Sequence, residues 1–216
     1  MARAVECSVF QEFFGNGPSI MAREYGPYEA YSKFLLVVDR ATEQPAGVLR
    51  IIQHSENGLK TLNDIAQEPL SISLQTVIDY HGIDDLSQCW EVGSLAVLKP
   101  YRGEAAGHLV STMLYGLFYK LVSGLGIRHV VAILDGHAYA QLTETFSVPF
   151  VPIAGSAPFP YLGSDNNRAA YARVSALVPT METKTDQLEE TTRKILKPHL
   201  SRMMYGAGLP PVVEIA

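Results

Sequence analysis

Residues 102–108 stand where a protein chain can bind a phosphate group. The apolar run 95–98 is stopped by Pro100, which indicates a buried strand that ends at a turn. Apolar residues then recur every three or four positions over 109–125 and predict a helix with one broad apolar face. A loop of small residues between a strand and a helix start gathers free backbone N–H groups, and these donors and the helix dipole favour a phosphate. The sequence therefore predicts an anion site at residues 102–108.

Glu91 is the candidate for a general base, because it lies near the start of the same strand. Its neighbours Trp90 and Val92 should partly desolvate the carboxylate, which raises the pKa toward the range useful for proton transfer. Acids perturbed in this way gather at functional sites. The alternative is a glutamate at a strand edge that forms an ion pair with an arginine.

The elements that must position these groups form a mixed α/β pattern. We expect strands at 34–39, 46–53, 90–98, 128–134, 150–153 and 169–178. We expect helices at 4–14, 59–66, 71–80, 105–123, 137–145 and 182–204. A loop containing Gly26-Pro27 precedes the first two strands, which form a hairpin, and the strand–helix–strand–helix order that follows favours one mixed sheet. We expect one domain over 1–180, with the C-terminal helix and tail of 181–216 packed on it.

Composition excludes several classes of protein. The 216 residues are 47% apolar and 18% charged, as in an ordinary soluble domain, and the net charge of −5 argues against nucleic acid as a partner. Two cysteines favour a reduced cytoplasm over a disulfide framework. No apolar run reaches the length of a membrane span, and the N-terminus lacks the pattern of a signal peptide. The six histidines are scattered, so we expect no metal site.

The loop Arg102-Gly103-Glu104-Ala105-Ala106-Gly107 has neither the Gly-Lys-Ser/Thr ending of a P-loop nor three spaced glycines. It follows a strand that carries Leu-Ala-Val and then a proline. In this setting it resembles the acyl-CoA loop of the GCN5-related N-acetyltransferase (GNAT) superfamily, whose pattern is Arg/Gln-x-x-Gly-x-Gly/Ala. Ala105 replaces the first glycine of that pattern, but it keeps the backbone N–H that a phosphate needs.

This resemblance covers about residues 30–178. It implies a GNAT-like mixed central sheet flanked by helices, in which the parallel strands 90–98 and 128–134 splay apart, followed by a C-terminal helical extension. It also implies that the pantothenyl arm of an acyl donor lies in the gap and bonds to the backbone like an extra strand. The donor-binding residues that it implies are Leu95, Ala96, Val97, Arg102, Gly103, Glu104, Ala105, Ala106, Gly107 and His108.

A narrower resemblance connects the first half of the chain to the acyl-homoserine-lactone synthases and N-acyl amino acid synthases, which share the GNAT fold. It is carried by Val9-Phe10, Tyr31, 34–39, 47–50 and Glu91, whereas the Pro-Thr of that group is Gln53-His54 here. It implies biosynthetic acyl transfer, with the acyl group supplied by acyl-CoA or by an acyl carrier protein. It also implies that Arg50 shapes the acceptor side, although a structural ion pair is equally open for this residue.

Both resemblances imply that Glu91 is the general base. GNAT enzymes often carry a tyrosine that acts as the general acid at the position of Thr143. Tyr139 and His137 lie nearby in this sequence and are therefore the candidates for that role. A core tyrosine with a wet hydroxyl and a capped surface histidine are their structural alternatives. Two residues of the long loop before the last strand, Tyr161 and Ser164, are candidates for acceptor binding. The helices between 59 and 80 could line an acyl tunnel or simply pack.

Taken together, these residues favour an N-acyltransferase in which an amine of a small molecule or peptide attacks the thioester directly. Neither cysteine lies in a Cys/His motif, so we expect no covalent enzyme intermediate. One alternative is a non-catalytic acyl-CoA-binding protein with the same fold. Another is a partner-binding module, whose helix 182–204 would dock on another chain, including a second copy in a homodimer.

Overall fold

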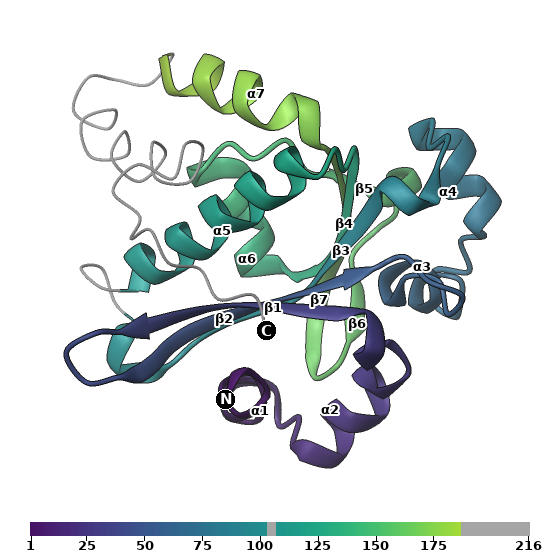
Figure 1. The fold of residues 1–216 in the computed structure, drawn as a ribbon. Helices are drawn as coiled ribbons and strands as arrows, with labels where there is room; N and C mark the ends of the chain where they lie inside the picture. Colours follow the sequence, from purple (N-terminus) through teal and green to yellow (C-terminus); the bar gives the residue numbers. More distant parts are fainter. Residues whose placement is uncertain (103–106, 187–216) are drawn as a thin grey trace.

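The computed structural model describes residues 1–102 and 107–186, and in these ranges one mixed sheet carries helices on both faces (Figure 1). The strands are β1 (Ser32–Asp39), β2 (Gln44–Gln53), β3 (Cys89–Val97), β4 (His129–Asp135), β5 (Val151–Pro152), β6 (Phe159–Tyr161) and β7 (Ser164–Arg173). Their order is β1-β2-β3-β4-β7-β5, and β6 pairs with β7 beside this path. Only the β3–β4 pair is parallel among these described strands. The predicted mixed α/β sheet is confirmed.

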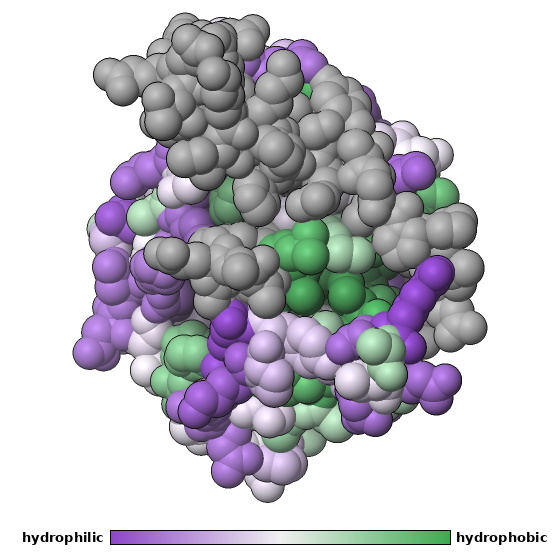
Figure 2. Space-filling model, turned by 90° about the vertical axis from the view of Figure 1, so that its left-hand side faces the viewer, coloured by the Kyte–Doolittle hydropathy of each residue, from purple (hydrophilic) through white to green (hydrophobic). Residues whose placement is uncertain are grey.

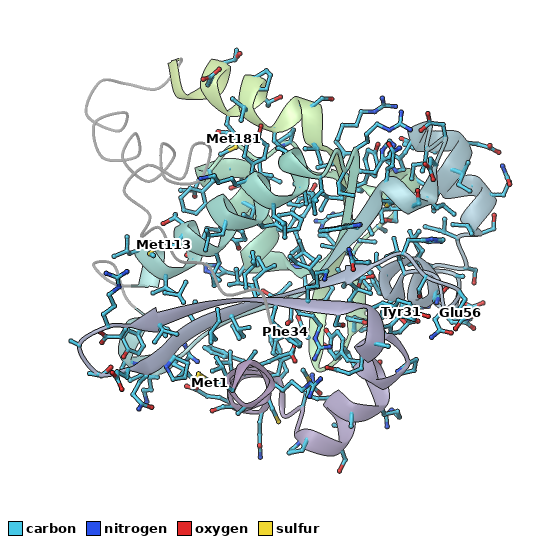
Figure 3. The ribbon with its side chains drawn as sticks, viewed as in Figure 1. Met1, Tyr31, Phe34, Glu56, Met113 and Met181 are labelled. Carbon is cyan, nitrogen blue, oxygen red and sulfur yellow. The ribbon has the colours of Figure 1, made fainter. Side chains whose placement is uncertain are left out.

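Helices cover both faces of this sheet. They are α1 (Ala2–Phe14), α2 (Pro18–Tyr25), α3 (Lys60–Ile65), α4 (Leu74–His81), α5 (Gly107–Gly124), α6 (Gly136–Ala140) and α7 (Val174–Asp186). Helices α1 and α2 lie on one side of the β1–β2 hairpin, and α5, α6 and α7 lie on the other (Figure 1). Figure 3 shows Met1 and Phe34 on the α1 side and Met113 and Met181 on the α5 and α7 side. Within the described ranges, no helix combines the length and the apolar character that a membrane crossing requires.

Alternation along β2 explains why both faces are covered. Leu49 and Ile51 are buried against Leu114 of α5, whereas Ile52 is buried against Tyr25 of α2. Because successive side chains of a strand point to opposite faces, a strand that is buried at nearly every position needs a packing layer on each side. The sheet therefore separates two cores, one toward α1, α2 and α3 and one toward α5 and α7.

Strands β3 and β4 form a fork. They are paired only from Cys89 to Glu91 on β3, opposite His129 to Val131 on β4, and beyond that point they separate. Gly93 is an extra residue in β3, because Val92 pairs with Ile51 and Ser94 pairs with the next residue, Arg50. Such a β-bulge bends a strand and exchanges the faces of the side chains that follow it. The splayed parallel strands expected from the sequence are thus present, and the bulge lies where they part.

Several boundaries differ from the sequence expectation. Tyr161 and Ser164, expected in a long loop, lie in β6 and at the start of β7, which begins before residue 169. Residues 18–25, expected as loop, form α2, which begins with Pro18 at the first helical position, where a proline costs no hydrogen bond. The strand expected over 169–178 ends at Arg173, and helix α7 starts at Val174 rather than at 182. The reason lies in the apolar residues Val174, Leu177 and Met181, whose three- and four-residue steps place them on one helix face that packs on the core.

Candidate active site

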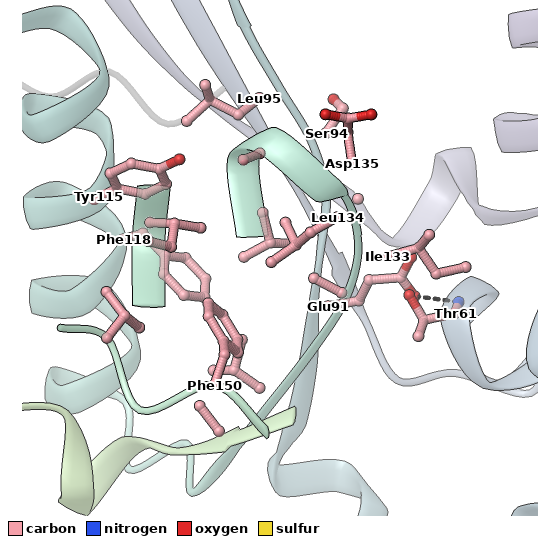
Figure 4. A pocket seen from close by; sticks show the side chains of 18 of the residues that line it. Thr61, Glu91, Ser94, Leu95, Tyr115, Phe118, Ile133, Leu134, Asp135 and Phe150 are labelled. Atoms are coloured by element: carbon pink, nitrogen blue, oxygen red, sulfur yellow. Dashed lines mark hydrogen bonds between the residues drawn. The ribbon is translucent and has the colours of Figure 1, made fainter. Parts of the chain in front are cut away.

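A cavity of about 220 Å³ occupies the fork between β3 and β4 (Figure 4). Its wall includes Glu91, the last paired residue of β3, and the residues beyond the pairing, 92–95 of β3 and 132–135 of β4. Side chains from both faces of the sheet complete the wall, with Phe10 and Tyr25 on one side and Phe118 on the other. The cavity therefore passes through the sheet where the strands diverge.

The two ends of this cavity differ in chemistry, and we call them the apolar half and the polar half. The apolar half lies toward α5, α6 and α7 and is lined by Tyr115, Phe118, Leu142, Val148, Phe150 and Leu177. The polar half lies toward α1, α2 and α3, where Thr61, Glu91, Ser94, Asp135, Ser164 and Asn167 join aromatic residues in the wall. Figure 4 shows Tyr115, Phe118 and Phe150 on one side of the space and Thr61, Glu91, Ser94 and Asp135 on the other. On the outside of the molecule, Figure 2 shows hydrophobic residues in a recess of the face at the left of Figure 1.

Glu91 is the buried carboxyl group at the base of the fork. Only 3% of the residue is exposed, and its Oε2 accepts a hydrogen bond of 2.8 Å from the backbone N–H of Thr61 at the start of α3. Burial raises the pKa of Glu91 to about 7, although bonds from Thr61 and the charge of Lys60 oppose this shift. A carboxyl group with such a pKa exchanges a proton readily at neutral pH, which is what a general base requires.

The two residues expected as general acids lie outside the cavity wall. The Tyr139 hydroxyl donates to the carbonyl of Phe150 at 3.3 Å, and burial raises the pKa of this tyrosine. His137 is exposed, and its backbone N–H donates to the Oδ1 of Asp135 at 2.9 Å, which is the capping arrangement that the sequence left open. Neither side chain therefore faces the space that Glu91 faces in this structure.

Tyr161 of β6 and Ser164 of β7, the two residues expected at the acceptor side, do line the cavity. Ser164 donates to the Oδ2 of Asp135 at 2.6 Å. The Tyr161 hydroxyl bonds to Asp64 and accepts from the Nζ of Lys60 at 2.7 Å, and burial holds the pKa of this tyrosine well above its usual range. Tyr161 is therefore held by α3, and Ser164 by β4.

Arg50 is a buried ion-pair residue and is absent from the cavity wall among the described residues. Its Nη2 and Nε contact the two carboxylate oxygens of Glu6 at 2.6 and 2.8 Å, and its Nη1 lies 3.0 Å from Glu29. The arginine and Glu6 are each only 2% exposed. Of the two readings left open by the sequence, the geometry favours the structural ion pair.

The donor-side residues divide into three groups. Leu95 lines the cavity, Ala96 packs toward α1, and the carbonyl of Val97 accepts a 2.5 Å hydrogen bond from the Nε of Arg102. The Arg102 guanidinium also pairs with Glu12 at 3.0 Å and lies over the ring of Phe13. Gly103, Glu104, Ala105 and Ala106 lie outside the described residues, and Gly107 and His108 are described only by their backbone at the start of α5.

Asp135 caps helix α6, and it is also a cavity residue that was not among the site residues expected from the sequence. Val131, Ile133 and Asp135 alternate along β4, and the first two pack in the core toward α2 and α3. Asp135 must therefore point to that same face, and it lines the polar half. If the alternation of side chains along 128–134 is continued by one residue, it predicts that Asp135 lies on the same face of the sheet as Glu91.

No protein-family model and no curated protein sequence matches this chain. The solved structures that are similar to it include two synthases. One is a CoA-dependent acyl-homoserine lactone synthase, BjaI, with SAM and isopentyl-CoA, which is 14% identical; the match covers 94% of this chain and 83% of that chain with a TM-score of 0.50. The other is FeeM, an N-acyl amino acid synthase from uncultured soil microbes, also 14% identical; the match covers 84% and 91% of the two chains with a TM-score of 0.53. The likeness is one of fold, and it confirms the GNAT-like architecture implied by the sequence resemblance.

Proposed function

We propose that this protein is an N-acyltransferase that moves an acyl group from a thioester, acyl-CoA or acyl carrier protein, to an amine. The observation that carries the proposal is the position of Glu91. It is a buried carboxyl group with a pKa of about 7 at the base of a cavity formed by two splayed parallel strands. The fold similarity to two synthases whose names describe acyl transfer supports the same reaction class.

The donor arm would lie along β3 beyond its last pair with β4. From Val92 onward, β3 has no partner strand on its β4 side in the described structure, so its backbone groups there are available to an extended ligand. The acyl chain would then enter the apolar half, where rings of α5 and the 148–150 segment exclude water. That half offers far more apolar wall than an acetyl group needs, which favours longer acyl chains.

In the reaction, Glu91 accepts a proton from the attacking amine, and the amine nitrogen forms a bond to the thioester carbonyl carbon. The carbon–sulfur bond then breaks, and the sulfur leaves as a thiolate or, after protonation, as a thiol. A backbone N–H near Val97 is the candidate that would stabilise the negative charge on the carbonyl oxygen. Because a thiolate of this kind is a fair leaving group, the reaction does not require Tyr139 or His137 to act as an acid.

The decisive test measures products by mass. The protein is incubated with acetyl-, octanoyl- or palmitoyl-CoA and a panel of amines, and the acylated amine and free CoA are quantified together. We expect one acylated amine for each thiol released, with octanoyl- or palmitoyl-CoA preferred over acetyl-CoA. Tight binding of acyl-CoA with no amide product from any amine would instead identify a non-catalytic acyl-CoA-binding protein.

A further inference from the structure

The charges around the cavity are all of one sign. Its wall contains two carboxyl groups, Glu91 and Asp135, and no lysine, arginine or histidine among the residues that the structure describes. A buried or half-buried charge needs a partner of opposite charge, because water is largely excluded. An acceptor with a carboxylate would find like charges in this wall, whereas a cationic acceptor would find partners.

The buried cations behind the wall are already neutralised. Arg50 is paired with Glu6 and Glu29, as described above. Lys60 is 2% exposed, and its Nζ lies 2.7 Å from Asp64 and 3.0 Å from Glu24. Each of these cations therefore has two carboxylate partners. Redirecting either of them to a substrate carboxylate would leave a protein carboxylate unpaired in the interior, which is costly.

Asp135 retains capacity for a ligand. Its Oδ1 accepts the backbone N–H of His137 and its Oδ2 accepts the hydroxyl of Ser164, one bond to each oxygen. A carboxylate oxygen can accept two hydrogen bonds, so one position on each oxygen is left. The two existing bonds fix the orientation of the carboxylate, which lines the cavity and is labelled among its residues in Figure 4.

Glu91 and Asp135 lie at different positions along the direction of the strands. Glu91 pairs across the sheet with Val131, and Asp135 follows Val131 by four residues on the same face. Four residues of extended strand cover about 13 Å. An acceptor that places its reacting nitrogen at Glu91 would therefore reach Asp135 only with a group several bonds away.

From this arrangement we propose that the acceptor is a diamine without a carboxylate, whose second, charged amino group binds Asp135. This inference rests on the proposed acyltransferase function and specifies its acceptor. It separates this chain from an N-acyl amino acid synthase, because an amino-acid acceptor would bring its carboxylate into a wall of carboxylates. Asp135 is thus assigned to acceptor specificity, and Glu91 to the chemical step.

The test compares acceptors that differ by one group. Octanoyl-CoA is supplied with 1,5-diaminopentane, 1,8-diaminooctane, the corresponding monoamines and lysine, which is 1,5-diaminopentane with a carboxylate. We expect kcat/KM to be at least about tenfold higher for the preferred diamine than for its monoamine, as for one charge-assisted hydrogen bond, and lowest for lysine. Equal rates for diamine and monoamine would overturn the assignment of Asp135, and a preference for lysine would overturn the acceptor class.

Asp135→Asn tests the residue itself. Asparagine caps a helix as well as aspartate does, so the variant should fold, which circular dichroism and thermal unfolding would check. We expect the ratio of diamine to monoamine kcat/KM to fall to about one, mainly through KM. The matched control is Asp165→Asn, since Asp165 is exposed on β7 and outside the cavity wall; it should keep the wild-type ratio. An unchanged ratio in Asp135→Asn would contradict the inference while leaving acyl transfer intact, and a wild-type protein that acylates no amine would instead contradict the proposed function.

Discussion

The apolar and polar halves of the cavity are built from the same two strands, yet they differ in nearly every respect. The half toward α5 and α7 is lined by aromatic and aliphatic side chains, and its wall shows no carboxyl group among the described residues. The half toward α1, α2 and α3 holds Glu91 and Asp135 and is backed by the ion pairs of Arg50 and Lys60. One sheet can thus present a surface for a hydrocarbon chain and a surface for a charged group within a single space.

This difference shows that the face of the sheet on which a side chain lies determines which half of the cavity it lines. Of the β4 residues, Leu134 packs with the core beside α7 while Ile133 packs with the core beside α3. Neighbouring residues of one strand therefore serve different substrates in the proposed reaction. A substitution in the polar half should alter chemistry or acceptor choice, and a substitution in the apolar half should alter donor choice.

Glu91→Gln removes the proposed general base from the polar half and should produce the largest effect on the rate. General bases contribute about 10²- to 10⁴-fold to rate, so we expect kcat to fall by at least 100-fold while acyl-CoA binding changes little. In the wild type, kcat/KM should rise with pH through about 7, where Glu91 ionises, and this rise should disappear in the variant. Steady-state rates from pH 5.5 to 8.5 and calorimetric binding of octanoyl-CoA would check both points. A variant with wild-type rate would remove Glu91 from the mechanism.

The free energy of unfolding should also depend on pH, because the pKa of Glu91 differs between the folded and the unfolded protein. The pKa of Glu91 is about 7 in the folded protein against an ordinary value of 4.5, so the folded state binds more protons than the unfolded state between these values. Stability from this group is therefore present at low pH and is lost as pH rises through 7, by about 3 kcal/mol in all. Because glutamine does not titrate, Glu91→Gln should gain up to that amount relative to the wild type between pH 5 and 8. Urea unfolding at several pH values measures it, and a difference between the two proteins that stays constant with pH would be the contrary result.

Ala138→Phe probes the apolar half and should have the smallest effect. Ala138 lies one helical turn before Leu142 and lines the cavity, so a phenylalanine there should occupy part of the space for the acyl chain. Overpacking costs about 1–3 kcal/mol, so we expect kcat/KM for palmitoyl-CoA to fall about tenfold relative to acetyl-CoA, with the amine preference retained. Ala140→Phe is the matched control, because Ala140 is half-buried on the same helix but outside the cavity wall. A change of amine preference in Ala138→Phe would show that the two halves do not act separately.

The sequence predicts the sheet from local patterns, and the resemblance to the GNAT superfamily implies the fork. Each strand contains a continuous apolar run, 95–98 and 130–134, as buried parallel strands do, and the structure pairs the two strands only at their first residues. The donor-side expectation for 103–106 lies outside the described residues and stays a prediction. The proposed role of Glu91 was also reachable from the sequence, since its burial follows from the strand that carries it.

The rest of the site depends on contacts between distant parts of the chain. Tyr139 was expected near the chemistry because it follows β4, but α6 turns its hydroxyl to the carbonyl of Phe150. Arg50 was expected at the acceptor side or in an ion pair, and only the docking of α1 brings Glu6 to it. Helix 18–25 was missed because its short sequence follows two glycines and carries a proline, the usual signals of a loop.

Gly93 has a consequence for how this chain must be aligned with others. As an unpaired residue in β3, it takes up one step of the alternation, so that Ser94 and Ala96 lie on the face that holds Glu91. If the same residues formed a strand with no bulge, Leu95 and Val97 would lie on that face instead. Deleting Gly93 would remove the bulge and leave Glu91, Ser94 and Ala96 on one face of a regular strand, because Val92 and Ser94 would then be neighbours. A relative that lacks one residue here must be aligned separately before and after Gly93. Residue roles can be compared only after the two parts of the strand have been aligned in this way.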